Sequence, residues 1–452
     1  MDDITSRIAH FAADLTYADI PARARAAATR SVIDSLGVAL AAHDADAVAV
    51  ATRVAPELPA GYATGRLLGR ASVSTTAEAA AFANAVMIRY LDLNDHLPNS
   101  HPSDCLGVFL GAGESLGLTG AQLITAMAVT YEVMAAIQLS SGGRKKGIDQ
   151  PWAMGIAVAA GLGNARGLSA TQIGHAVGIM AASGVALRVI RTGEISKWKA
   201  GGTGMAARNA LYVVSLVEAG MTGPARAFDG RMGMFGILGE FTLPPIGPAE
   251  HMLSIADTDI KCWPVCYALQ GSVWAALALR EKVAFDDVEA IRIWTHTNAA
   301  NEAEADKYDP QSRETADHSM PYVVTRAYQN GTVGVADFEA ASYLDPAVRP
   351  AMRKISIRPD ETIDAALPDD LIVRMQVQDR AGEVHDVEIR NPKGHGKNPL
   401  ADSDVTDKAT RLLTPVLGAQ RAGEALAWWW QVETADSLTP GLDLVALTPP
   451  RA

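Results

Sequence analysis

Cysteine, aromatic residues and excess positive charge are all scarce in this sequence of 452 residues. The three cysteines are an odd number and form no CxxC pair, which argues against a disulfide framework and indicates a reducing compartment. The net charge of −12 argues against a nucleic-acid or membrane-surface partner, because either one requires a basic surface. An anionic ligand must therefore be bound by a few locally placed cations or by helix N-termini.

The signals of secretion and of a membrane span are also missing. The first residues, MDDITSRIAHFAADL, are acidic and amphipathic, so we expect no signal peptide and a cytoplasmic protein. The most apolar stretch, 121–139, is interrupted by polar residues and is predicted to be a buried helix. An HExxH motif is absent, and no glycine-rich segment has the P-loop order.

The chain has parts with two different patterns of apolar residues. Its length exceeds the size at which single hydrophobic cores stop growing. Apolar residues recur at helical spacing in most of the first part, with predicted helices at 76–91, 105–117, 121–140, 152–165, 170–184 and 204–219. After a helix near 267–281, residues alternate with period two at 289–295, 353–358, 372–378 and 384–389, the last two as a hairpin. The helical pattern returns at 402–417 and 420–433.

This order predicts a mainly α fold. A large, discontinuous all-α domain is expected from residues 1–258 and 397–452, with a smaller α+β lid domain inserted at 259–396.

The first polar cluster lies in the loop after the helix at 76–91. It contains Asp92, Asn94 and His101, and carboxylates beside imidazoles supply general acids and bases. The same residue types in a turn that contains proline also cap the following helix, so the spacing leaves both interpretations open.

The second polar cluster is Ser196-Lys-Trp-Lys-Ala-Gly-Gly-Thr-Gly204, ahead of a helix expected to begin at Met205. Lys197, Lys199 and the free N–H groups after Gly202 suit a carboxylate or phosphate. A tight turn with surface lysines is the alternative.

Two more clusters lie in the second half of the chain. Lys261-Cys-Trp-Pro-Val-Cys266 has two cysteines four residues apart, too few ligands for zinc or an iron–sulfur cluster, so buried structural cysteine is favoured. The segment from Arg313 to Tyr322, which includes His318, suits either a site or an ordinary helix N-terminus.

Taken together and in this order, the clusters resemble the MmgE/PrpD family, which includes 2-methylcitrate dehydratases, cis-aconitate decarboxylases and an iminodisuccinate epimerase. The resemblance covers nearly the whole chain and is carried by RYLDLNDHLPNSHPSD, GIDQPWAMGIAVAAGLGNARGLS, SKWKAGGTGMAARNALYVVSLVEAGMTGP, KCWPVC, RETADHSMPYVV and PKGHGKNPLADSDVTDK. It implies a homodimer with a helical domain, an inserted lid, and a site between the two that needs neither metal nor cofactor.

The resemblance also assigns roles to residues. It implies catalytic roles for Asp92, His101, Lys197, His318 and Tyr322, and substrate-binding roles for Asn94, Asp149, Gln150, Lys199, Gly202, Lys261, Cys266 and Arg313. Two positions depart from the decarboxylase branch, which has histidines where this chain has Asp149-Gln150 and Cys266.

The expected function is therefore that of a metal-independent hydro-lyase acting on a small polycarboxylate. Dehydration of a 2-methylcitrate-like β-hydroxy acid is the favoured reaction. Aconitases use an iron–sulfur cluster for the leaving hydroxyl, and this chain lacks a suitable cysteine arrangement, so protein groups would do that work. Decarboxylation of a cis-aconitate type of acid, epimerisation or isomerisation of a dicarboxylate, and non-catalytic binding of a small dicarboxylate are the alternatives.

Overall fold

Helices form wherever apolar residues recur at helical spacing in the first half of the chain. The computed structural model describes residues 1–59, 61–97, 100–192, 195–247 and 254–447. The helices of this half are α1 (Asp3–Asp14), α2 (Ala22–Ala41), α3 (Asp46–Arg53), α4 (Ala77–Tyr90), α5 (Leu106–Ala112), α6 (Gly120–Ser140), α7 (Pro151–Ala165), α8 (Ala170–Ser183), α9 (Trp198–Glu218) and α10 (Phe235–Leu238). Hydroxyl side chains start several of them, as Thr119 does for α6 and Ser169 for α8.

Among the described residues, α6 is the one helix long and apolar enough to cross a membrane. Of its most apolar window, 83% is buried within the protein, as predicted for a helix of the core.

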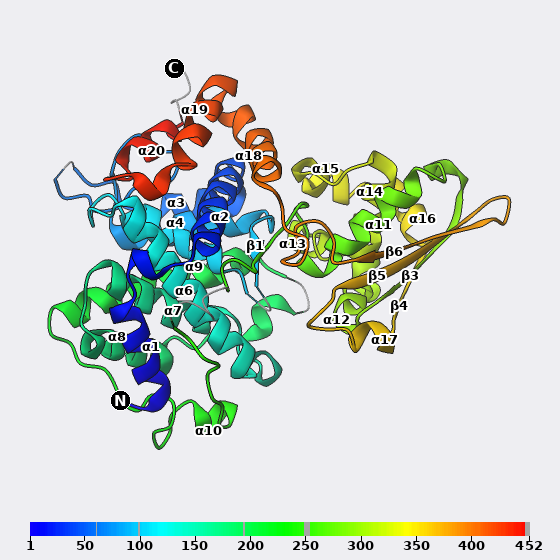
Figure 1. Cartoon of the computed structure of the whole chain (residues 1–452). Coiled ribbons are helices and arrows are strands. Elements are labelled where there is room, and N and C mark those ends of the chain that lie inside the picture. Colours follow the sequence, from blue (N-terminus) through cyan, green and yellow to red (C-terminus); the bar gives the residue numbers. More distant parts are fainter. Residues whose placement is uncertain (60, 98–99, 193–194, 248–253, 448–452) are drawn as a thin grey trace.

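The C-terminal helices return to this helical body, as expected. They are α18 (Asp402–Leu417), α19 (Ala419–Trp429) and α20 (Thr439–Leu444), and α18 packs along α2. Figure 1 shows them beside the N-terminal helices, with the α+β domain lying apart from both. Buried apolar residues from 4–255 and 400–445 share one core, and those from 265–377 form another. The fold class is therefore confirmed, while the boundaries at 258 and 396 stay predictions.

The α+β domain is built on one four-stranded sheet with the order β4-β3-β5-β6. Its strands are β3 (Val288–Thr295), β4 (Ile355–Pro359), β5 (Ile372–Asp379) and β6 (Val384–Arg390), and β5 and β6 form the predicted hairpin. On β5, Val373, Met375 and Val377 are buried, and α11 (Gln270–Arg280) packs on β5 and β6. The other helices are α12 (Thr297–Ala300), α13 (Arg313–Ala316), α14 (Met320–Asn330), α15 (Ala340–Tyr343), α16 (Arg349–Met352) and α17 (Glu361–Asp364).

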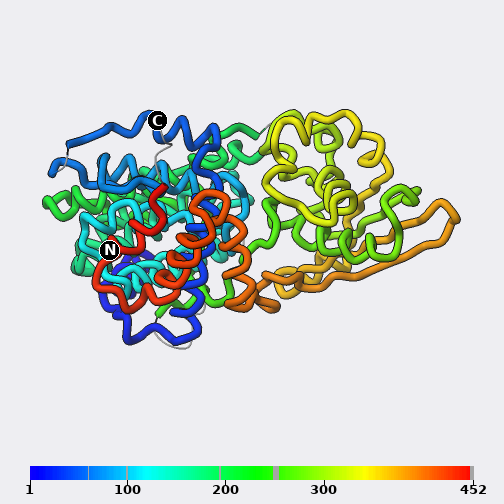
Figure 2. The backbone as a smooth tube through the Cα atoms, turned by 90° about the horizontal axis from the view of Figure 1, so that it is seen from above, coloured from blue at the N-terminus to red at the C-terminus, as the bar shows by residue number. Residues whose placement is uncertain are grey.

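Two short strands join this domain to the body. The chain crosses between the two bodies at both ends of the α+β domain (Figure 2). At the first crossing, β2 (Asp259–Ile260) pairs antiparallel with β1 (Asp95–His96) of the polar loop after α4. His96 Nδ1 lies 3.1 Å from Asp259 Oδ2, and the His96 ring stacks on Tyr267 at 3.8 Å between centroids. The polar loop is thereby fixed against the start of the α+β domain.

The start of α9 differs from the prediction. The helix begins at Trp198 and not at Met205, so Gly202 lies inside it, where N–H groups donate to the preceding turn. These glycines permit close packing, because a Cβ at Gly204 would lie 3.0 Å from the Phe82 carbonyl oxygen of α4. The N–H groups after Gly202 are therefore not free as expected, while the substrate-binding role of Gly202 stays a prediction.

Candidate active site

Asp92 lies just after α4 and is the centre of a buried ionic cluster. Its φ of 50° is left-handed, a conformation that costs free energy outside glycine and is found at functional sites. The carboxylate accepts a hydrogen bond from Arg89 Nη1 at 2.7 Å and pairs with Lys199 Nζ at 3.0 Å. Lys261 Nζ donates to the same carboxylate and, at 2.9 Å, to the Asp92 carbonyl oxygen. Three cations from α4, α9 and the first crossing therefore converge on one carboxylate.

The α+β domain adds a second carboxylate and an imidazole to this cluster. Asp317 and His318 lie in the turn between α13 and α14, and His318 Nδ1 lies 2.5 Å from Asp317 Oδ1. Lys199 Nζ lies 3.0 Å from each oxygen of Asp317, and His318 Nε2 lies 3.9 Å from Asp92 Oδ2. Both contacts join the helical body to the α+β domain, so the cluster spans their interface.

Neighbouring charges decide the protonation states in this cluster. Burial would raise the pKa of Asp92, but Arg89, Lys199 and the other cations hold it well below its ordinary value. Burial would lower the pKa of His318, but the Cys266 thiol group and the Asp317 carboxylate raise it to about 9.

At neutral pH the resulting balance of charge is positive. Four cationic side chains face three carboxylates, the former being Arg89, Lys199, Lys261 and His318 and the latter Asp92, Asp104 and Asp317. Such a centre favours a ligand with several negative charges.

His101 has the opposite protonation state to His318. Its Nδ1 lies 2.6 Å from the Asp95 carbonyl oxygen. Because a carbonyl only accepts, Nδ1 carries the proton and Nε2 keeps its lone pair. Burial, followed by the charges of Arg89 and Lys261, lowers the pKa of His101 well below its ordinary value. His101 is therefore a neutral imidazole at neutral pH, with a basic nitrogen that this hydrogen bond leaves free.

Gln150 and Asn94 fix the acidic loop, while their predicted roles in substrate binding stay predictions. Gln150 Oε1 accepts a hydrogen bond from the His101 backbone N–H at 2.7 Å. Asn94 Nδ2 donates to Ser103 Oγ and to Asp104 Oδ1, both at 2.9 Å. These contacts make the two amides positioning residues in this structure.

Asp149 holds two arginines close to the cluster. Its carboxylate lies 2.8 Å from Arg191 Nε and 3.7 Å from Arg188 Nη1. The side chain of Arg191 is 13% exposed, and its Nη2 has no hydrogen-bond partner among the residues that the structure describes. Sequence analysis missed Arg191, a cation with a donor available for a ligand.

Two further carboxylates of the first polar cluster, Asp95 and Asp104, are buried. Burial raises the pKa of Asp95 to about 7 and that of Asp104 to about 6. Ser103 Oγ donates to Asp95 at 2.5 Å, and the Tyr131 hydroxyl donates to it at 2.7 Å. The sequence placed both carboxylates in the cluster without assigning either a separate role.

Lys408 of α18 connects the cluster to the C-terminal helices. Its Nζ donates to the Leu93 carbonyl oxygen at 2.8 Å and to the Lys261 carbonyl oxygen at 2.7 Å, and it pairs with Asp34 at 2.6 Å. Lys408 thus fixes the backbone beside Asp92 and at Lys261. It is a positioning residue, and its distance in sequence from both partners hid it.

Tyr322 does not contact the cluster. Its side chain is fully buried in the α+β core, its hydroxyl donates to the Asp337 carbonyl oxygen, and its ring lies 6.0 Å from that of Phe338. Burial raises its pKa further above the ordinary value. The geometry therefore gives no support to the predicted catalytic role of Tyr322.

Arg313 and Cys266 lie at the interface between the domains. The Arg313 guanidinium lies over Tyr90 at 4.9 Å and over Phe338 at 5.4 Å, and its Nε and Nη2 have no hydrogen-bond partner among the described residues. The half-buried Cys266 lies next to His318, since its Sγ is within 4.8 Å of a ring nitrogen. Their roles toward a substrate stay predictions.

Lys197 and Lys199 are two residues apart in sequence but lie in different environments. Its side chain is 59% exposed and pairs with Asp46 of α3, while that of Lys199 is 4% exposed within the cluster. The exposed position of Lys197 gives no support to its expected catalytic role, which stays a prediction, whereas Lys199 belongs to the ionic cluster.

Replacing Lys197 by alanine should leave turnover unchanged and lower the free energy of unfolding by at most about 1 kcal/mol, because exposed ion pairs contribute little. Lys199→Ala is the matched comparison and should abolish most of the activity, since it removes a buried cation between two carboxylates. Steady-state kinetics and urea unfolding of both variants provide the measurement. A large loss of activity in Lys197→Ala alone would restore the original assignment.

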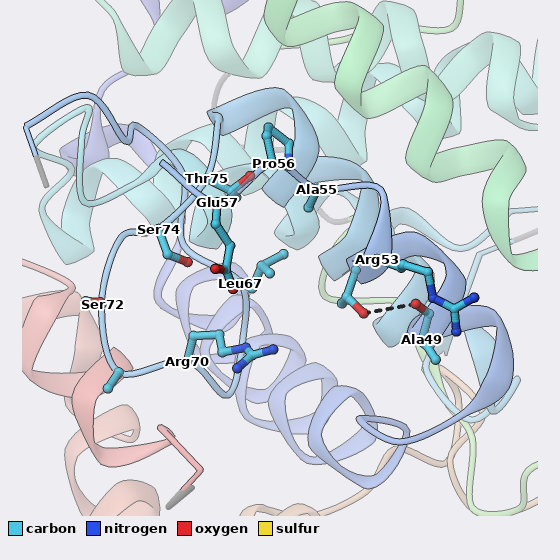
Figure 3. A pocket seen from close by; sticks show the side chains of 12 residues that line it. Ala49, Arg53, Ala55, Pro56, Glu57, Leu67, Arg70, Ser72, Ser74 and Thr75 are labelled. Atoms are coloured by element: carbon cyan, nitrogen blue, oxygen red, sulfur yellow. Dashed lines mark hydrogen bonds between the residues drawn. The ribbon is translucent and has the colours of Figure 1, made fainter. Parts of the chain in front are cut away.

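A cavity of about 540 Å³ lies elsewhere, on the helical body near α3. Figure 3 shows Arg53, Glu57, Arg70 and Thr75 among the residues that line it. None of the ionic cluster's residues contributes to it. Size alone therefore does not locate the candidate site, which is defined by charge and by contacts between the domains.

Comparison with known proteins identifies the family of the chain. The MmgE/PrpD N-terminal domain model matches residues 6–242, and the MmgE/PrpD C-terminal domain model matches residues 263–431. A "2-methylcitrate dehydratase-like protein oryR" of Aspergillus oryzae is 28% identical over 94% of this chain and 91% of its own length. The 2-methylcitrate dehydratase of Escherichia coli K12 is 27% identical over 63% of each chain, and the cis-aconitate decarboxylase of Mus musculus is 24% identical over 84% of this chain and 80% of its own. The chain belongs to the MmgE/PrpD family.

Proposed function

We propose that the protein is a lyase that removes water from a small β-hydroxy polycarboxylic acid of the 2-methylcitrate type. The observation that carries this proposal is the pairing of two histidines in opposite protonation states around a buried cationic centre. His101 is neutral with Nε2 available, while the pKa of about 9 keeps His318 protonated. A base and an acid of this kind suit elimination near neutral pH.

The reaction then requires only protein groups for proton transfer. His101 Nε2 takes the proton from the carbon next to a carboxylate, and the electron pair of that C–H bond forms the new C=C bond. The C–O bond to the hydroxyl breaks, and His318 supplies the proton with which the hydroxyl leaves as water. The cations around Asp92 stabilise the negative charge that develops on the carboxylate in the transition state.

The substrate carboxylates would be bound by cations that the structure already gathers. Lys199 and Lys261 are held by Asp92, and Arg191, which also interacts electrostatically with Asp92, has an Nη2 without a hydrogen-bond partner in the described part of the chain. The side chains of Lys199, Lys261 and Asp92 are at most 4% exposed, so entry of substrate requires the two domains to separate. Closing them again would exclude water and strengthen the ionic contacts.

An assay against a panel of acids tests the function. The purified protein is mixed with 2-methylcitrate, citrate, cis-aconitate and related acids, while ultraviolet absorbance, carbon dioxide release and optical rotation are followed. A rise in absorbance from a new C=C bond without carbon dioxide supports dehydration. Carbon dioxide release would indicate a decarboxylase, and a change in optical rotation alone an epimerase. Binding without any turnover would instead favour a non-catalytic binder.

We also propose that the protein forms a homodimer, as the family resemblance implies, and acts in the cytoplasm. Large apolar side chains are exposed on the helical body at Leu187, Val189 and Tyr212, a feature compatible with a contact between two copies.

A further inference from the structure

A second group of side chains lies at the outer edge of the ionic cluster. Cys266 follows the first crossing, Glu302 lies in a 3-10 turn after α12, and His318 belongs to the turn between α13 and α14. The Cys266 thiol, one carboxylate oxygen of Glu302 and one imidazole nitrogen of His318 all lie within 4.8 Å of one another. All three residues are partly exposed, whereas Asp92 and Asp317 are buried.

These donors are of the kinds that bind a borderline-soft divalent cation. Zinc sites combine thiolate, imidazole and carboxylate ligands, and three protein ligands leave one position open to water. The bond from His318 Nδ1 to Asp317 adds the outer contact that metal-binding histidines usually make, because it directs Nε2 away from that carboxylate.

We propose that Cys266, Glu302 and His318 form a binding site for Zn²⁺ and similar cations, and that occupancy of this site inhibits the enzyme. The cation displaces a proton from the protonated imidazole into solvent and binds the lone pair that this proton leaves, so His318 no longer has that proton to give to the leaving hydroxyl. Inhibition rests on the proposed function, whereas binding does not. The metal is thus an inhibitor and takes no part in the reaction.

Charges near the site limit how tightly the cation binds. Lys307 Nζ lies 3.7 Å from Glu302 Oε2, and Lys199 Nζ lies 3.3 Å from His318 Nδ1. Arg188 also acts electrostatically on Cys266 and Glu302. These cations oppose a second positive ion, so we expect reversible binding that a chelator removes.

Titration with Co²⁺ alone, in the absence of any acid, provides the test. Polycarboxylates chelate metals, so the readout is the near-ultraviolet absorption of a thiolate–Co²⁺ bond and not turnover. One Co²⁺ per chain should produce this band, and Zn²⁺ should abolish it by displacement. Its appearance is independent of whether the protein proves to be a lyase.

Three variants make the result specific to this site. Cys266→Ser should abolish the band, and Glu302→Gln should weaken Co²⁺ binding by at least about 10-fold, the smallest effect usual for losing an outer contact alone. Cys262→Ser is the matched control, because that partly exposed thiol donates to the Lys393 carbonyl oxygen and should leave the band unchanged. Circular dichroism verifies that each variant is folded. Absence of the band in the wild type, its persistence in Cys266→Ser, or its loss in Cys262→Ser would overturn the proposal.

Discussion

Replacing Asp92 by asparagine is expected to lower the free energy of unfolding by about 3–5 kcal/mol, the usual cost of leaving buried charges without a partner. Asparagine keeps the shape of the side chain but not its charge. Arg89, Lys199 and Lys261 would then lose their shared counter-charge at a buried position. Turnover should fall as well, because the cations would no longer be held where a substrate carboxylate binds.

Urea unfolding of the wild type and of Asp92→Asn at neutral pH measures this difference. Asp46→Asn is the control, since it removes the carboxylate that pairs with the exposed Lys197 and should cost at most about 1 kcal/mol. The folded pKa of Asp92 lies below its unfolded value. Its stabilisation is therefore present above pH about 4 and is lost as the pH falls through the folded pKa. Equal stability of Asp92→Asn and wild type at pH 7 would contradict the ionic cluster.

Most of the fold was predictable because it depends on local patterns. The alternation of apolar residues at 372–378 and 384–389 is visible in sequence, and so is the helical spacing around 121–140. The start of α9 was not predictable in this way. Two adjacent glycines, Gly201 and Gly202, are typical of a turn in a local sequence pattern. They lie inside a helix because of close packing, which only the three-dimensional structure shows.

Some residues of the candidate site could likewise be predicted from the sequence, and others could not. Asp92, His101 and His318 stand out in sequence because titratable residues are clustered there. Arg89, one turn before Asp92, resembles any helical arginine until its burial is known. Lys408 lies 315 residues from Leu93, whose carbonyl oxygen it binds, and no spacing rule connects them. Lys197 and Lys199 are two residues apart, and only the structure at the start of the helix shows that Lys199 points inward and Lys197 outward.

Replacing His101 by asparagine should lower kcat by about 10²–10⁴, the usual contribution of a general base or acid. The amide nitrogen of asparagine takes the place of Nδ1 and can keep the hydrogen bond to the Asp95 carbonyl oxygen. The basic Nε2 has no equivalent in asparagine, so the variant separates proton transfer from loop structure. Wild-type kcat in folded His101→Asn would exclude His101 as the base.

The pH profile of kcat/KM, which reports the pKa values of the free enzyme, distinguishes the base from the acid. His101 acts as the base while it is neutral. Its pKa lies well below 6.5, so its protonation should lower the activity only at pH values below 6.5. His318 acts while protonated, and its pKa of about 9 places the alkaline fall near pH 9. His101→Asn should remove the acid limb from the residual activity, and His318→Gln the alkaline one. A profile in which either variant keeps both limbs would reassign the acid and the base.

Stability changes in the same alkaline range and must be measured separately. The folded pKa of His318 lies above its unfolded value of about 6.5, so its stabilisation is complete below pH 6.5 and is lost as the pH rises through 9. Wild-type stability should therefore decline between these values, while that of His318→Gln should change less. If kcat/KM falls at a pH where unfolding curves show the wild type still folded, the fall reports proton transfer by His318 and not loss of structure.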